Sequence, residues 1–134
     1  MRYKAYMTRS IALVALAVAS CAAPPPDAQQ QQSPPLELAG LAAAGPPARC
    51  VTINPIQSLQ VSDNNRHVLL YRDGRTTYAN YLAPYCSIGR DDVIVTEPTG
   101  SQYCRGDIVR TFDRSSRIPG PACILNDFVP YRRP

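Results

Sequence analysis

The segment that decides the fold is His67-VLLYRDGRTTYANY-Leu82, in which two β-favouring runs flank Asp73-Gly74. Asp and Gly both tolerate positive φ, so this pair predicts a two-residue type I′ turn between antiparallel strands. In that register Leu69 lies opposite Tyr78. Apolar side chains then occupy both faces of the hairpin, which is typical of a small barrel or roll rather than of a sheet covered on one side.

Short β-favouring runs separated by turn residues continue along the chain after Cys50, and no stretch there has helical periodicity. The other predicted strands cover 56–61, 92–96, 108–112 and 123–125. The segment 128–131 is predicted to be a tail that follows the last strand. Together these patterns predict an all-β domain, a small antiparallel barrel or roll of about five to six short strands.

Two turns are expected to depend on particular residues. Gly74 provides the positive φ of the hairpin turn, and Gly106 provides it in the turn before the strand at 108–112. Asp107 is expected to accept backbone amide hydrogens across that second turn. Arg105-Gly106-Asp107 also spells an adhesive tripeptide, but three residues recur by chance, so we favour the structural interpretation.

The N-terminus has a basic start, an apolar run over 11–19 and then Ser20-Cys21, which is the order of a secretory signal. With Val18 and Ala19 before it, Cys21 resembles the lipobox cysteine of bacterial lipoproteins, which implies acylation at the mature N-terminus. By the same resemblance, Ala22 instead of Asp favours the outer membrane. The alternatives are a plain secretory signal with a free thiol at position 21, and an uncleaved anchor. The apolar run is about half of the ~20 residues that a spanning helix needs.

Proline, alanine, glutamine and glycine dominate the next segment, which includes Pro24-Pro25-Pro26 and four consecutive glutamines. Such a composition buries too little apolar surface to fold, so we expect a disordered tether, with at most a short helical turn within 36–44. The predicted organisation is a signal peptide over 1–20, a tether over 21–48 and a small all-β domain over 49–134.

Four cysteines follow the tether, at Cys50, Cys86, Cys104 and Cys123. Export places them in an oxidising compartment, where paired cysteines form structural disulfides. A zinc site is poorly supported, because no Cys-x-x-Cys spacing is present and His67 is the only histidine. We expect Cys86–Cys104 nested inside Cys50–Cys123, because the outer bridge would join the two ends of the domain.

The charge balance does not indicate a nucleic-acid partner. Loss of the three basic residues of the signal lowers the formal charge from +4 to +1. Arg72 and Arg75 flank the hairpin turn, and Tyr71 lies beside them. Arg and Tyr are enriched at binding hot spots, so these three are candidate partner-binding residues for an acidic or polar ligand. The alternative is tyrosines at the core edge and solvated arginines.

The sequence gives little support for a set of catalytic residues. A nucleophilic triad would require His67, which we expect in a structural place on a strand. Asp91 and Asp92 are adjacent, so their side chains diverge instead of facing each other across a cleft. No Gly-rich phosphate loop is present. We therefore expect no enzymatic activity, no cofactor and no metal.

The order of these features resembles a family of small exported or lipid-anchored bacterial proteins of unknown function that carry four spaced cysteines. The residues that carry the resemblance are Cys50, Cys86, Cys104, Gly106, Asp107, Ile108 and Cys123. The resemblance covers nearly the whole domain and none of the tether. It implies the fold and the disulfides, and it implies no activity.

The expected function is that of a non-catalytic lipoprotein of the bacterial cell envelope, acting as a binding or structural module. Its partners are then the membrane, through acyl chains on Cys21, and an unidentified envelope or extracellular protein or glycan. One alternative is an inhibitor of an extracellular enzyme such as a lysozyme, which a protruding loop with convergent polar groups would favour. A small hydrolase is less favoured, and a cleft lined by paired carboxylates would indicate it.

Overall fold

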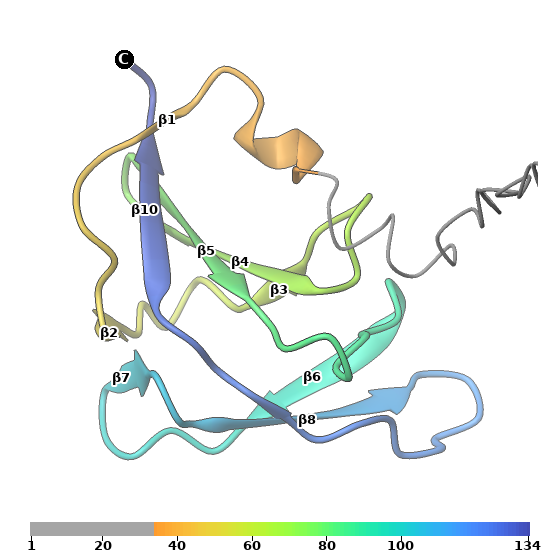
Figure 1. Cartoon of the computed structure of the whole chain (residues 1–134). Helices are drawn as coiled ribbons and strands as arrows, with labels where there is room; N and C mark the ends of the chain where they lie inside the picture. The colour runs from red at the N-terminus through yellow and green to blue at the C-terminus, as the bar shows by residue number, and fades with distance from the viewer. Residues whose placement is uncertain (1–33) are drawn as a thin grey trace, which may run out of the picture.

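The structure is a computed structural model and describes residues 34–134, so the predicted signal and Cys21 lie outside the described residues. This part of the chain is all-β, with antiparallel sheets and one 3-10 turn (Figure 1). None of its helices is long and apolar enough to cross a bilayer. The elements are η1 (Leu36–Leu38), β1 (Ala42–Ala43), β2 (Cys50–Thr52), β3 (Gln60–Val61), β4 (Val68–Asp73), β5 (Thr76–Tyr81), β6 (Asp92–Thr96), β7 (Gln102–Cys104), β8 (Ile108–Asp113), β9 (Cys123–Ile124) and β10 (Phe128–Arg132).

Three antiparallel sheets form two layers around one main core. A five-stranded sheet of order β1-β10-β5-β4-β3 lies above sheets β2-β7 and β6-β8-β9 in Figure 1. All three sheets contribute to this core. Its fully or nearly fully buried members include Val51, Leu69, Tyr71, Tyr103, Val109, Leu125 and Phe128. Within residues 34–134 there are more strands than the five to six expected, because several loops pair over only two or three residues.

The central hairpin forms with a register two residues away from the predicted one. Leu69 lies opposite Asn80 instead of Tyr78, and the two-residue loop is Gly74-Arg75 instead of Asp73-Gly74. Gly74 has φ 56° and Arg75 has no positive φ, so the loop needs only one residue in the left-handed region. A type II′ turn has that requirement, with Gly at its first central position.

The two faces of the hairpin are as predicted, because a shift of two residues keeps every side chain on its face. Leu69 and Tyr71 point into the main core. Val68, Leu70 and Ala79 form a second small cluster on the opposite face, against Leu38 and Tyr131. The large sheet is therefore apolar on both sides near its centre.

The segment 128–131 is a strand inside the large sheet, so its assignment as a tail was wrong. β10 pairs with β5 through four residue pairs, and Phe128 is fully buried. The assignment failed because Pro130 lacks the amide hydrogen that an interior strand donates. In the structure the Pro130 carbonyl accepts a 2.8 Å hydrogen bond from the Ala44 amide. Pro130 therefore faces β1, and its missing donor leaves the β5 ladder intact.

The folded unit begins before the predicted boundary at residue 49. η1 forms within the segment expected to hold a short helical turn, and β1 pairs with the end of β10. Ala48 exchanges two 2.8 Å backbone hydrogen bonds with Phe128. Residues 36–48 thus join the sheet mainly through their backbone, which a composition of small residues does not reveal.

Two disulfides form, but both predicted pairings were wrong. The bridges are Cys50–Cys104 and Cys86–Cys123. Cys50 lies directly opposite Cys104 on β2 and β7, with 4.0 Å between the Cα atoms. Cys123, at the start of β9, and Cys86 are both fully buried in the main core. The nested pairing failed because β2 pairs with β7 and not with the last cysteine-bearing strand.

The turn between β7 and β8 has the arrangement expected of it. Gly106 has φ 97°, and the Asp107 carboxylate accepts a 2.8 Å hydrogen bond from the Cys104 amide. The Gly106 amide also donates to the Leu125 carbonyl at 2.9 Å. The carboxylate of the adhesive tripeptide is therefore engaged in the turn beside the first disulfide.

Asn80 fixes the point at which the chain crosses from the β6-β8-β9 sheet to the large sheet. It is fully buried. Its amide nitrogen donates to the Asn126 carbonyl at 2.6 Å, and its amide oxygen accepts from the Asn126 amide at 2.9 Å. Asn126 in turn donates from its side chain to the Tyr81 carbonyl at 2.6 Å. The hydrogen bonds between Asn80 and Asn126 therefore attach the segment between β9 and β10 to β5, although this segment is not itself a strand.

Non-reducing peptide mapping should recover Cys50–Cys104 and Cys86–Cys123. Replacing Cys86 and Cys123 together by serine should lower the free energy of unfolding by about 3–4 kcal/mol, because the bridge closes a long loop in the unfolded chain. The sequence separation of this bridge is 37 residues. Denaturant unfolding measures the change, and a loss below about 1 kcal/mol would contradict a stabilising role for this disulfide.

Candidate functional site

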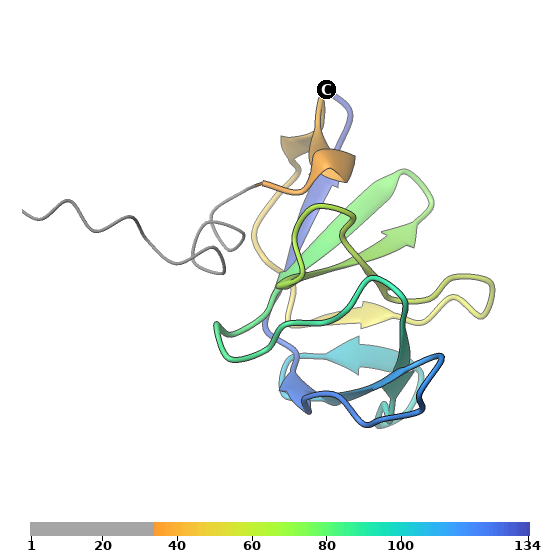
Figure 2. The same cartoon turned by 90° about the vertical axis from the view of Figure 1, so that its right-hand side faces the viewer.

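A cleft of about 810 Å³ opens at one end of the large sheet. Three segments meet there: the β4–β5 turn, the stretch between η1 and β1, and the end of β10. In both views η1 and the C-terminal end lie together at this end, away from β7 and β8 (Figures 1 and 2). The lining residues are Glu37, Ala39, Leu41, Arg72, Gly74, Arg75, Thr77, Arg132, Arg133 and Pro134.

Four arginine side chains dominate the electrostatics of this cleft. Arg72 and Arg75 come from the hairpin, and Arg132 and Arg133 come from the end of β10. Within residues 34–134 the ion pairs are Arg105–Asp127 and Arg110–Glu97, and neither includes a cleft arginine. All four cleft arginines are exposed. The side chains that line the cleft therefore carry an excess of positive charge, with four guanidinium groups against the single carboxylate of Glu37.

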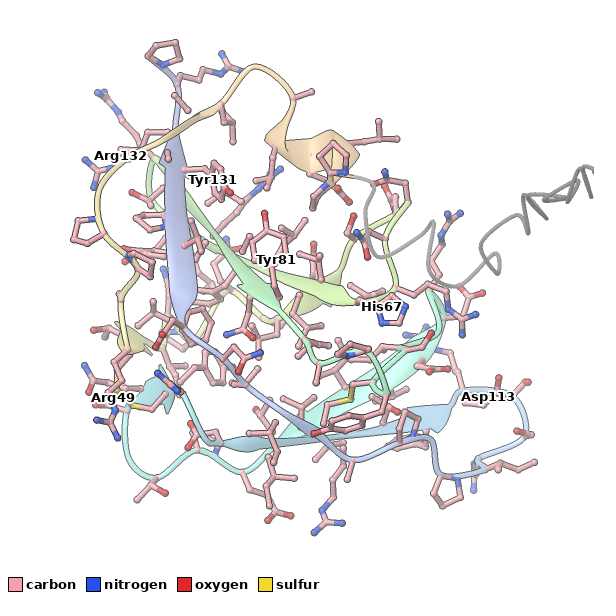
Figure 3. The ribbon with its side chains drawn as sticks, viewed as in Figure 1. Arg49, His67, Tyr81, Asp113, Tyr131 and Arg132 are labelled. Atoms are coloured by element: carbon pink, nitrogen blue, oxygen red, sulfur yellow. A yellow bond between two sulfur atoms is a disulfide. The ribbon has the colours of Figure 1, made fainter. Side chains whose placement is uncertain are left out.

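The position of Arg132 is defined by a specific contact. Its Nε donates a 2.7 Å hydrogen bond to the Thr76 hydroxyl, across the β10–β5 pairing. Figure 3 labels Arg132 at the upper end of β10, far from Arg49 beside the Cys50–Cys104 bridge. A guanidinium held in this way keeps its remaining N–H donors available to a ligand.

Glu37 is the one carboxylate side chain among the cleft residues, and its oxygens are already engaged. Oε1 accepts a 2.7 Å hydrogen bond from the Asp63 amide, and Oε2 accepts a 2.9 Å bond from the Ser62 hydroxyl. Nearby, Asn64 accepts from the Leu36 amide at 2.9 Å. These contacts attach η1 to the turn between β3 and β4, and so they form one wall of the cleft.

The environment of Glu37 favours its charged form. Partial burial raises the pKa of this carboxyl. The hydrogen bonds from Asp63 and Ser62 and the charge of Arg72 lower it by more, so the pKa lies below its usual value. The folded state therefore binds a proton at Glu37 less readily than the unfolded chain does. The resulting stabilisation is complete above the ordinary carboxyl pKa and is lost as the pH falls through the lowered pKa.

Of the three predicted partner-binding residues, the structure brings two to the cleft. Arg72 and Arg75 line it, together with Gly74. Tyr71 does not, because it is 1% exposed and lies in the main core. Its hydroxyl donates to the Thr52 carbonyl at 2.9 Å and accepts from the Asn54 amide at 2.6 Å. Tyr71 was misassigned because strand alternation turns it to the face opposite Arg72.

Three residues that line the cleft were not predicted from the sequence: Arg132, Arg133 and Glu37. The two arginines lie in or directly after the strand that was taken for a tail, and Glu37 lies in the segment taken for the tether. The available signal was the β-favouring run Phe128-Val129, which follows a short polar turn in the manner of another strand. Pro130 interrupts this run and weakens the signal.

His67 lies in a buried position beneath the loop that follows β5. It is 5% exposed, and its Nδ1 lies 2.7 Å from the Cys86 carbonyl oxygen. Its Nε2 has no hydrogen-bond partner within the part of the chain that the structure describes. Figure 3 shows the ring away from the arginine cleft. These contacts place His67 in the packing around the Cys86–Cys123 bridge.

Tyr81 and Tyr131 form a polar contact on the outer face of the large sheet, with 3.0 Å between their hydroxyl oxygens (Figure 3). Burial and the hydrogen bond between the two hydroxyls raise the pKa of Tyr81. Residues 34–134 contain no group of three or more His, Cys, Asp and Glu side chains suited to a metal ion.

Comparisons of the chain with protein families, with curated proteins and with solved structures find no match. The resemblance to four-cysteine exported proteins therefore stays a prediction, and function has to be argued from the cleft.

Replacing Glu37 by glutamine should lower the free energy of unfolding by about 1 kcal/mol at pH 7, because the charged acceptor of the Asp63 amide is lost. The difference from the wild type should shrink as the pH falls from about 4.5, the ordinary pKa of the carboxyl in the unfolded chain, through the lowered pKa of the native carboxyl. Urea unfolding at pH 7 and pH 3 measures both effects.

The matched control is Glu97→Gln, at an exposed ion pair with a 3.9 Å separation, which should change stability little at either pH. An equal loss in Glu37→Gln at both pH values would show that the charge of Glu37 does not contribute.

Proposed function

We propose that the protein is a non-catalytic binding module of the bacterial cell envelope, anchored through acyl chains on Cys21, and that it binds an anionic ligand in the arginine cleft. The observation that carries the proposal is the convergence of Arg72, Arg75, Arg132 and Arg133 on one cleft whose lining includes a single carboxylate side chain, that of Glu37. Arginine presents a planar fork of N–H donors that matches carboxylate and phosphate oxygens.

A structural explanation of the arginines is less satisfactory. Four like charges around one cleft repel one another, and such repulsion destabilises a compact state. Their exposure means that they add little to the hydrophobic core. A cluster of this kind is better explained by a ligand that neutralises it. The cleft also lacks the facing pair of free carboxylates that would favour a small hydrolase, because the oxygens of Glu37 are engaged.

One observation favours the second candidate, an inhibitor of an extracellular enzyme such as a lysozyme. The exposed loop after β8 is ordered by Asp113, whose carboxylate accepts hydrogen bonds from Ser115 and Ser116. These bonds hold the pKa of Asp113 well below its usual range. Loss of lysozyme inhibition in Asp113→Ala, with the arginine cleft intact, would favour this candidate over the anion-binding module.

The double change Arg72→Ala with Arg75→Ala tests the proposed function. The probe is inositol hexakisphosphate, titrated calorimetrically into the full chain in a neutral detergent. Loss of two exposed charge contacts of roughly 0.7 kcal/mol each should weaken binding about tenfold. The melting temperature should change little, because exposed substitutions usually alter stability by less than ~0.5 kcal/mol.

The matched control removes the same charge elsewhere, with Arg49→Ala and Arg110→Ala, two exposed arginines outside the cleft. This control should retain the wild-type affinity at equal ionic strength. Equal weakening in both double variants would assign the binding to net charge and would contradict a site at the cleft.

A further inference from the structure

We propose that the arginine cleft docks on the phosphate head groups of the membrane that anchors the chain, so that the domain lies with its β4–β5 turn against the lipid surface. The inference rests on the proposed function, because it needs the anchor at Cys21 and an anion-binding cleft. It identifies the anionic ligand as the anionic lipid surface itself.

The described chain begins next to the arginine cleft. The Pro34 carbonyl accepts a 3.0 Å hydrogen bond from the Asn64 side chain, and the Leu36 amide donates to the same side chain at 2.9 Å. Glu37, one residue later, lines the cleft. The first described residues, 34–37, are therefore held at the end of the domain that carries the cleft, shown uppermost in Figures 1 and 2.

Only a short length of chain separates this point from the proposed anchor. Thirteen residue steps separate Cys21 from Pro34. A chain of that length spans at most about 45 Å when fully extended. A domain held on so short a connection meets the membrane at a high effective concentration, so weak surface contacts suffice to seat it.

The charge of the cleft is complementary to that of an anionic membrane surface. A basic residue close to an anionic membrane surface contributes about 1 kcal/mol, and the attraction decays within a Debye length. The cleft brings four arginines to the end of the domain at which the described chain begins. Leu36, next in sequence to the lining residue Glu37, is an apolar residue of η1 that is 66% exposed. Basic residues beside an exposed apolar side chain suit the boundary between head groups and acyl chains.

The test measures which end of the domain faces the bilayer. The acylated full chain is reconstituted into vesicles of phosphatidylglycerol and phosphatidylethanolamine, and separately into neutral phosphatidylcholine vesicles. A nitroxide is attached through Ala42→Cys, an exposed position of β1 near the cleft, or through Gln102→Cys, an exposed position of β7 at the opposite end. Power saturation with a water-soluble nickel chelate reports the accessibility of each label.

We expect the label at position 42 to lose accessibility several-fold on anionic vesicles relative to neutral ones, and the label at position 102 to stay fully accessible on both. Arg72→Ala with Arg75→Ala, or high salt, should restore accessibility at position 42. The control pair Arg49→Ala with Arg110→Ala should leave the protection in place.

Each other outcome has a distinct meaning. Equal accessibility at position 42 on both vesicles, in a chain that floats with neutral vesicles and binds inositol hexakisphosphate, overturns the docking inference and leaves the proposed function standing. That result would assign the cleft to a soluble anion. A chain that does not float with neutral vesicles lacks the anchor, and then both proposals fail.

Discussion

The crossed pair of disulfides is the constraint on which the rest of this fold depends. Each bridge, Cys50–Cys104 and Cys86–Cys123, has one cysteine inside the loop that the other closes, so the two bridges interlock along the chain. The first bridge holds β2 against β7, and the second joins the loop after β5 to β9. A domain of this size has a modest core, and such covalent links replace part of the stability that a larger core would provide.

The features that the sequence predicted are those that depend on local patterns. Alternation in the His67–Leu82 segment identified the faces of the hairpin, because the side-chain period of a strand is fixed by its geometry. Gly106 and Asp107 could be assigned because a tight turn limits which residues fit. The hairpin register was missed by two residues, since Asp73-Gly74 and Gly74-Arg75 are both acceptable loops and only the flanking pairing distinguishes them.

The features that the sequence did not predict depend on contacts between distant segments. Four cysteines permit three pairings, and the observed one follows from the pairing of β2 with β7, for which the short β2 segment has no local signal. The cleft is a similar case. Its walls come from η1, the hairpin and β10, and two of these had been placed outside the folded strands. Tyr71 and Arg72 are neighbours in sequence, yet the strand turns one into the core and the other into the cleft.

The covalent and charged features of the domain lie apart, and this separation has a physical consequence. The Cys50–Cys104 bridge lies away from the arginine cleft, beside the Arg49 labelled in Figure 3. Clustered arginines lower stability through mutual repulsion, and a functional surface often carries such a penalty. Here the disulfides and the shared core maintain the fold without the arginines, while Glu37 secures the cleft wall through Ser62 and Asp63. The cleft can therefore keep an excess of positive charge, because the disulfides and the main core lie outside it.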